Sequence, residues 1–208
     1  MVQLITAAMF GIFIQNAILE RALGLNILMY AAGKKRYVFG FTLGIIYITS
    51  VSAALAYKID TLLGVTAAAN SALPAYVSAV RPVLYMAVVG LVYIVSTIVI
   101  WRFFPSAFSE IKHYVHLSAL NSSVLGALYL CSSSAAAAVS GGGILAYVGF
   151  GVGTGLGFLL AALLLYAAEN RLRSKYIPPS FRGMPVTLVY IGIVSLALYA
   201  FVGYSTNI

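Results

Sequence analysis

Long apolar segments separated by short polar ones fill almost the whole chain. The hydrophobic runs cover residues 4–31, 38–57, 83–104, 114–138, 143–168 and 185–204. A bilayer core about 30 Å thick is crossed by roughly 20 residues of helix, so each run is long enough for one crossing. The pattern predicts an all-α integral membrane protein with six transmembrane helices. Residues 60–80 are less apolar and are predicted to be an interfacial or outer loop.

Composition supports one membrane domain over residues 1–208. Hydrophobic residues make up 62% of the 208 positions and charged residues only 8%, whereas a soluble domain is about 45–50% apolar and about 25% charged. The net charge of +8 does not indicate nucleic-acid binding, because the basic residues form no stripe with interleaved aromatic residues.

The basic residues predict the orientation. Loops after the first, third and fifth runs carry nine of the twelve Lys and Arg residues: Lys34, Lys35, Arg36, Arg102, Lys112, Arg171, Arg173, Lys175 and Arg182. Loops rich in Lys and Arg stay in the cytoplasm, so both termini are expected outside. Lys58 and Arg81 are expected in loops on the outer side.

The two halves of the chain resemble each other. Gly40-Phe41-Thr42-Leu43-Gly44 and the segment that begins at Gly149 both read Gly-Phe-x-x-Gly, with an offset of 109 residues. This predicts an inverted 3+3 repeat with half-repeats at residues 1–105 and 106–208. Simple packing of helices by small residues explains these glycines equally well. The alternating glycines of residues 149–157 are expected to allow close helix contact.

Several polar residues fall inside the apolar runs, and those singled out here are Asn16, Glu20 and Arg21 in the first run and Asn121 in the fourth. In a continuous helix Asn16 and Glu20 share a face, whereas Glu20 and Arg21 point about 100° apart and do not pair well. Such residues are costly in lipid and need partners. They belong either to a helix end or subunit contact, or to a path for ions or electrons.

Catalysis by this chain alone is not expected. The chain has four acidic residues, of which Asp60, Glu110 and Glu169 are expected near helix ends, so no Ser-His-Asp set or carboxylate pair can be assembled. The single cysteine, Cys131, excludes an internal disulfide and is expected to be a small core residue.

Several segments together resemble one family from end to end. Residues 16–25 are similar to a family pattern of Asn, an apolar run, a basic residue and Leu-Gly-Leu, and Lys34-Lys35 fits its first loop. Residues 121–126 resemble Asn-Cys-x-Val-Leu-Gly, and residues 177–183 resemble Val-Pro-x-x-Phe-Arg-Gly. The chain is thus similar to the A-type membrane component of Rnf electron transport complexes and to its counterpart, the E-type component of sodium-pumping NADH:quinone oxidoreductase.

The resemblance implies a subunit of an ion-translocating redox complex in a bacterial or archaeal cytoplasmic (inner) membrane. Its partners would be a homologous sister membrane subunit, similar to the E-type component of Rnf or the D-type component of the sodium pump, and subunits that carry flavin and iron–sulfur groups. The complex would move electrons across the membrane, coupled to Na⁺ or H⁺.

The resemblance also implies a two-iron two-sulfur cluster shared with the sister subunit, and here the chain departs from the family. The family's cysteines map onto Asn26 and Ser122, and cluster iron is normally held by thiolates. Cys131 lies nine residues beyond Ser122, roughly 13.5 Å along a helix. We therefore expect no cofactor in this chain, and the alternative is a cluster held by unusual oxygen ligands or entirely by the partner. For the function, the alternatives to a redox-complex subunit are a stand-alone small-molecule carrier and a purely structural assembly subunit on the same scaffold.

Overall fold

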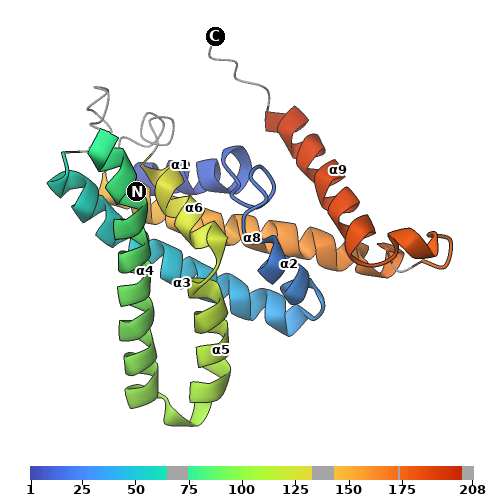
Figure 1. Cartoon of the computed structure of the whole chain (residues 1–208), viewed down its shortest axis with the longest axis horizontal. Coiled ribbons are helices and arrows are strands. Elements are labelled where there is room, and N and C mark those ends of the chain that lie inside the picture. Colours follow the sequence, from blue (N-terminus) through green and yellow to red (C-terminus); the bar gives the residue numbers. More distant parts are fainter. Residues whose placement is uncertain (65–74, 133–142, 173, 203–208) are drawn as a thin grey trace.

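The computed structural model describes residues 1–64, 75–132, 143–172 and 174–202, and these residues form helices and turns without a strand. Figure 1 shows the arrangement of the helices, with α4 and α5 forming a hairpin that projects from the other helices. In chain order the elements are α1 (Val2–Met9), the π-helical turn η1 (Phe10–Ile14), α2 (Leu25–Ala32), α3 (Lys35–Leu62), α4 (Ala75–Phe103), the 3₁₀ turn η2 (Pro105–Ala107), α5 (Phe108–Ala119), α6 (Ser122–Cys131), α8 (Ile144–Leu172), the 3₁₀ turn η3 (Pro179–Phe181) and α9 (Met184–Val202).

Three helices of the described residues are long and apolar enough to cross a membrane: Lys35–Leu62, Ala79–Phe103 and Ile144–Glu169. Shorter apolar helices are Val2–Ile14, Ser122–Cys131 and Met184–Ala200. The all-α prediction is confirmed for the described residues, whereas six crossings stay a prediction.

The first apolar run is divided rather than forming one helix. Between η1 and α2 the chain turns, and the side-chain oxygen of Asn16 accepts the N–H groups of Ile18 at 3.0 Å and Leu19 at 3.1 Å. Gly24 directly precedes α2 with a φ of +78°, a conformation that glycine adopts without a steric penalty. These groups supply the backbone with the partners that a continuous helix would have provided.

The fourth apolar run is also divided, between α5 and α6. Asn121 has extended backbone angles (φ −87°, ψ 130°), and its side-chain oxygen accepts the N–H of Ser123 at 3.1 Å. Asparagine is a favoured residue at this position because it satisfies an amide that has no partner within the helix. A new helix therefore begins at Ser122, where the hydropathy pattern alone predicts a continuous one.

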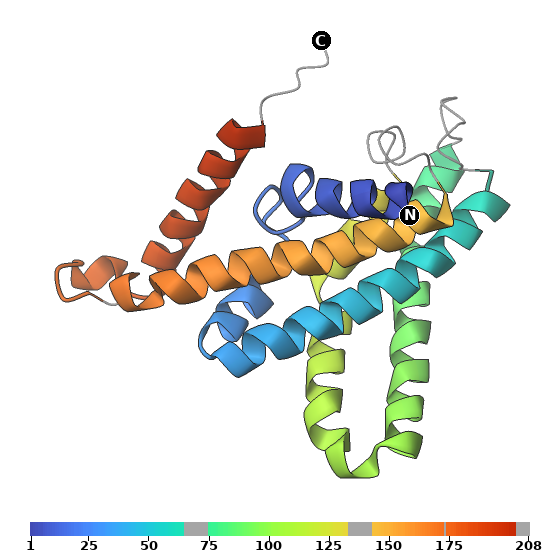
Figure 2. The ribbon, with the colours of Figure 1, turned by 180° about the vertical axis from the view of Figure 1, so that it is seen from behind.

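Helix α8 packs between α1 and α3 through glycines on two faces, and Figure 2 shows α8 running along both. Gly149 and Gly153 lie against the backbone of α1, and Gly151 and Gly155 lie against α3. A methyl group added to Gly151 would lie 2.9 Å from the Cα of Ser50. The prediction that these glycines allow close helix contact is confirmed.

Helix α3 uses its own glycines against α5. A Cβ added to Gly40 would lie 2.5 Å from Cε1 of the Tyr114 ring, and one added to Gly44 would lie 3.2 Å from the Cβ of Ser118. The Gly-Phe-x-x-Gly segment of α3 thus faces α5, whereas the matching segment of α8 faces α1.

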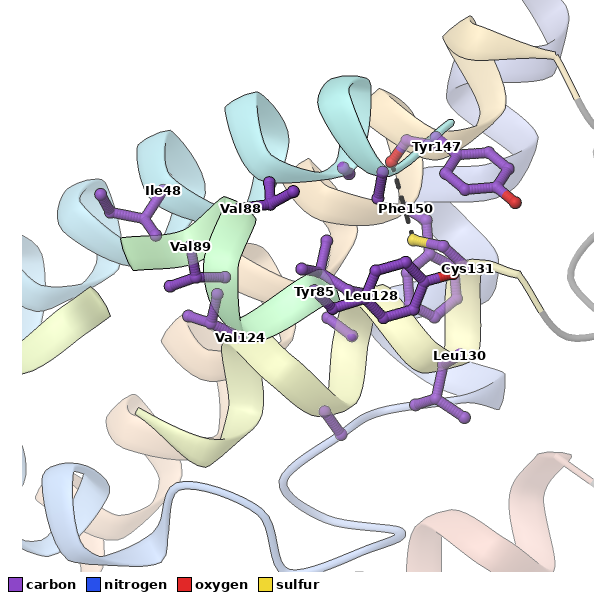
Figure 3. Packing of buried hydrophobic residues seen from close by; sticks show 14 of the residues in the cluster. Ile48, Tyr85, Val88, Val89, Val124, Leu128, Leu130, Cys131, Tyr147 and Phe150 are labelled. Carbon is purple, nitrogen blue, oxygen red and sulfur yellow. Dashed lines mark hydrogen bonds between the residues drawn. The ribbon is translucent and has the colours of Figure 1, made fainter. Parts of the chain in front are cut away.

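The buried side chains form two apolar clusters. One, shown in Figure 3, joins α4 and α6 to α8 and includes Val88, Leu128 and Phe150. The other joins α2 and α3 to the second half of α8 and includes Leu28 and Phe158. Large apolar side chains are exposed along α4 and α9, for example Val83, Leu91, Ile98, Ile193 and Leu196.

The two ends of the predicted loop at residues 60–80 differ from the prediction, whereas its middle, residues 65–74, lies outside the described residues. Helix α3 continues to Leu62 and α4 begins at Ala75, so the polar residues at both ends of this segment are helical. Arg81, also expected in an outer loop, lies within α4 and is buried. The burial of Asp60 and Arg81 follows from their pairing with each other.

Candidate functional site

The two helix breaks meet in space. The N–H of Gly24 donates to the Ser122 hydroxyl at 2.9 Å, and a methyl group added to Gly24 would lie 3.1 Å from the Asn121 Cγ. We call Gly24, Asn121 and Ser122 the helix-break junction. Segments almost one hundred residues apart in the sequence are therefore held together at the starts of α2 and α6.

Asn26 and Ser122 are the positions predicted to match the family's cluster cysteines. Ser122 is part of this junction, and Asn26 lies two residues after Gly24. Asn26 is in the first turn of α2, and Ser122 is the first residue of α6. Both residues are exposed on the surface of the chain. A group that contacts both side chains would therefore be reached from outside this chain.

The residues present do not fit an iron–sulfur cluster. Asn26 offers a neutral amide, and the Ser122 hydroxyl already accepts the Gly24 N–H, whereas clusters need thiolates or imidazoles. Cys131 is 4% exposed and lies in the apolar core, where its thiol donates to the Tyr147 carbonyl at 3.8 Å. Its predicted role as a core residue is confirmed.

The two asparagines predicted to lie inside apolar runs are both buried at the helix breaks. The Nδ2 of Asn16 donates to the Ile12 carbonyl at 2.9 Å and to the Gly157 carbonyl at 3.4 Å, which ties the first break to α8. The side-chain oxygen of Asn121 caps α6. Both side chains therefore stabilise helix ends.

Glu20 and Arg21 differ from the prediction. They do not lie on a helix, because the segment between η1 and α2 is a series of turns. An Arg21 nitrogen lies 3.8 Å from a Glu20 carboxylate oxygen, and both residues are exposed. The expectation that adjacent residues point about 100° apart was wrong here because it assumed helical geometry.

A buried polar cluster that sequence reasoning missed lies where α3, α4 and α8 meet. We call Asp60, Arg81, Tyr85 and Tyr147 the Asp60 cluster. The Tyr85 hydroxyl donates to Asp60, 2.7 and 2.8 Å from its two carboxylate oxygens, and the Tyr147 hydroxyl donates to Oδ2 at 2.8 Å. Asp60 and Tyr85 are each only 1% exposed. Figure 3 shows Tyr85 and Tyr147 on either side of Cys131.

Arg81 supplies the positive charge of this cluster. Its Nε lies 3.4 Å from the Asp60 Oδ1, and one of its terminal nitrogens lies 3.4 Å from Oδ2. The same terminal nitrogen donates to the Tyr85 hydroxyl at 2.9 Å. The four-residue spacing of Arg81 and Tyr85 on one helix face is a signal present in the sequence. The participation of Tyr147 has no such signal.

Long apolar helices, an apolar exterior and a buried ion pair together define a helical membrane protein. The chain belongs to the Rnf-Nqr family, because residues 4–205 match the family described as "Rnf-Nqr subunit, membrane protein". The family resemblance of the sequence segments is therefore confirmed.

Named relatives come from two complexes. The chain is 27% identical over 190 residues to the A-type component of the ion-translocating oxidoreductase complex of Pasteurella multocida, covering 91% of this chain and 92% of the relative. It is 26% identical over 192 residues to the component of the same name in Tolumonas auensis, with 92% of each chain covered. It is 25% identical over 198 residues to the E-type component of the Na(+)-translocating NADH-quinone reductase of Hahella chejuensis, with 94% of each covered.

Proposed function

We propose that this chain is a membrane subunit of an ion-translocating redox complex and supports electron transfer across the membrane, coupled to Na⁺ or H⁺ movement. The observation that carries this proposal is the family match over residues 4–205, with relatives from two such complexes that align over nine-tenths of their length. Any catalysis belongs to the assembled complex.

The proposed scaffold is six crossings in an inverted 3+3 repeat. Each half has a broken helix, then a long helix, then a further apolar helix, in the same order. The glycine contacts support this: Gly40 and Gly44 of α3 face Tyr114 and Ser118 of α5, whereas Gly149 and Gly153 of α8 face Leu4 and Ala8 of α1. The contact of α3 with α5 and the contact of α8 with α1 therefore occupy equivalent places in the two halves of the chain. Packing by isolated small residues does not predict this equivalence.

The proposed partners are a homologous sister membrane subunit and subunits that bear flavin and iron–sulfur groups. Two exposed polar residues at the helix-break junction, Ser122 and the nearby Asn26, support a protein neighbour there, because polar groups are costly against lipid. We propose that this chain holds no cofactor of its own. Its location is the bacterial or archaeal inner membrane, with both termini outside.

Affinity purification of the tagged chain from its native membrane in mild detergent tests this function. We expect a sister membrane subunit and coloured flavoproteins in the purified material, and redox-driven cation uptake after reconstitution into liposomes. A colourless chain that purifies alone and transports a small molecule would overturn the proposal in favour of a carrier. A complex whose electron transfer is unchanged without this chain would leave it a structural assembly subunit.

A further inference from the structure

Only one of the chain's four carboxylates is buried. Asp60 is 1% exposed, whereas Glu20 and Glu110 are exposed and Glu169 is partly exposed. A carboxylate inside a membrane protein is costly and commonly marks a path for ions. If the interior of this chain binds a cation through a carboxylate, Asp60 is the residue that does so.

Side-chain oxygen atoms from three helices meet at this position. Asp60 lies in the last turn of α3, Tyr85 on α4 and Tyr147 in the first turn of α8. Both tyrosine hydroxyls lie within 2.8 Å of the carboxylate. Carboxylate and hydroxyl oxygens are hard donors of the kind that bind hard cations.

The neighbouring helix α6 adds no charge to the site. Its Cys131 thiol donates to the backbone of Tyr147. Among the residues that the structure describes, the titratable groups that face Asp60 are Arg81 and Tyr85 from α4, Tyr147 from α8 and Cys131 from α6.

Arg81 is held near Asp60 without a close ion pair. Both of its contacts with the carboxylate are 3.4 Å, beyond the roughly 2.7–2.9 Å typical of a charge-assisted hydrogen bond. The exposed pair of Arg36 and Glu110 in the same chain reaches 2.7 Å. The buried Nε of Arg81 makes no hydrogen bond within the described residues. Tyr85 holds the guanidinium at 2.9 Å, so this charge is tethered mainly through the tyrosine.

We propose that the Asp60 cluster is a binding site for a small monovalent cation, H⁺ or Na⁺, in which the cation and Arg81 compete for the Asp60 carboxylate. The inference rests on the proposed function and names the residue through which this chain takes part in ion movement. When the cation is bound, it neutralises Asp60, and Arg81 keeps its contact with Tyr85. When the cation leaves, Arg81 supplies the charge that keeps the buried carboxylate stable. Because α3 ends within two residues of Asp60, the site lies at one end of the bundle, on the side predicted to be outside.

The test uses the whole complex in liposomes, with cation uptake and electron transfer measured together. Asp60→Asn should abolish the contribution of this site, so that cation uptake per electron falls several-fold. Arg81→Gln removes the competitor and should lower the half-saturating Na⁺ concentration several-fold if Na⁺ is the ligand. If the ligand is H⁺, Arg81→Gln should instead shift the pH dependence of uptake at saturating Na⁺. The matched control is the exposed ion pair of Arg36 and Glu110. Arg36→Gln and Glu110→Gln should leave the dependence of uptake on Na⁺ concentration and on pH unchanged.

A structural ion pair predicts a different result. Asp60→Asn and Arg81→Gln would then lower the yield of folded complex alike, and the surviving complex would keep wild-type Na⁺ and pH dependences, which overturns the inference. If the complex with Asp60→Asn does not assemble, Tyr147→Phe and Arg81→Lys are measured instead. A changed dependence of uptake on Na⁺ concentration or pH supports the cation site, and an unchanged dependence overturns it. If wild-type complex takes up no cation under any redox drive, the proposed function itself fails.

Discussion

At the scale of single residues, Gly24 is the position where two distant segments approach most closely. Its φ of +78° alone makes alanine costly there by about 1 kcal/mol, and the added methyl group would also collide with Asn121. Gly183 has a similar φ of +83° but nothing within 4 Å. Gly24→Ala should therefore reduce thermal stability clearly more than Gly183→Ala. Heating followed by fluorescence-detected size exclusion of a tagged chain measures this; equal effects would mean that the junction does not hold the breaks together.

Asn26 and Ser122 provide a second residue-scale prediction. Because an amide and a hydrogen-bonded hydroxyl are poor iron ligands, the double change Asn26→Ala and Ser122→Ala should leave the iron content of the purified complex unchanged. Iron analysis and electron paramagnetic resonance on the intact assembly measure this, and the yield of sister subunit shows that assembly is preserved. Loss of an iron–sulfur signal in an assembled complex would show that these side chains hold iron.

Individual residues also show where sequence reasoning stops. Asn121 followed by two serines is a sequence signal for the start of a helix. The hydropathy pattern shows no break there, because the flanking residues are apolar. The Asp60 cluster could not be derived, because Tyr147 reaches Asp60 across 87 residues of sequence and no local pattern encodes that contact. The exposure of Asn26 and Ser122 likewise depends on tertiary packing.

At the scale of elements, α8 offers the sharpest prediction. A methyl group at Gly153 would lie 2.9 Å from the Cα of Ala8, and backbone cannot move aside as a flexible side chain can. Gly153→Ala should therefore separate α8 from α1 and lower the melting midpoint. Gly90 on α4 has nothing within 4 Å, so Gly90→Ala should leave the midpoint unchanged or raise it slightly, since alanine favours helix by about 1 kcal/mol. The same heating assay compares them, and a shift of the same sign in both would contradict the packing described for α8.

Run length predicted the long helices well and the broken ones poorly. Residues 38–57, 83–104 and 143–168 lie almost entirely within α3, α4 and α8, because a continuous apolar stretch without helix-ending residues forms a helix. The first and fourth runs are equally apolar, but Asn16, Gly24 and Asn121 give their backbones partners outside a continuous helix. Hydropathy reports whether a segment avoids water and does not report whether its backbone turns.

At the scale of the whole molecule, the distribution of charge predicts the side on which each loop lies. Tyr176 is 97% exposed within the basic segment between α8 and α9, and Leu62 is 86% exposed at the other end of α3 from Lys35. Since basic loops remain in the cytoplasm, Tyr176→Cys should react with a membrane-impermeant maleimide only after the cytoplasmic membrane is permeabilised. Leu62→Cys should react in cells whose outer membrane or cell wall has been opened but whose cytoplasmic membrane is intact.

The single native cysteine provides the control for this labelling experiment. Cys131 is the only cysteine in the sequence and is buried, so wild-type protein should remain unlabelled from either side until it is denatured, and Cys131→Ser gives a background without thiols. Labelling of position 176 in intact cells, with protection of position 62, would invert the orientation. It would also place the Asp60 cluster at the cytoplasmic end of the bundle, where it would take up cations rather than release them in a pump that moves them outward.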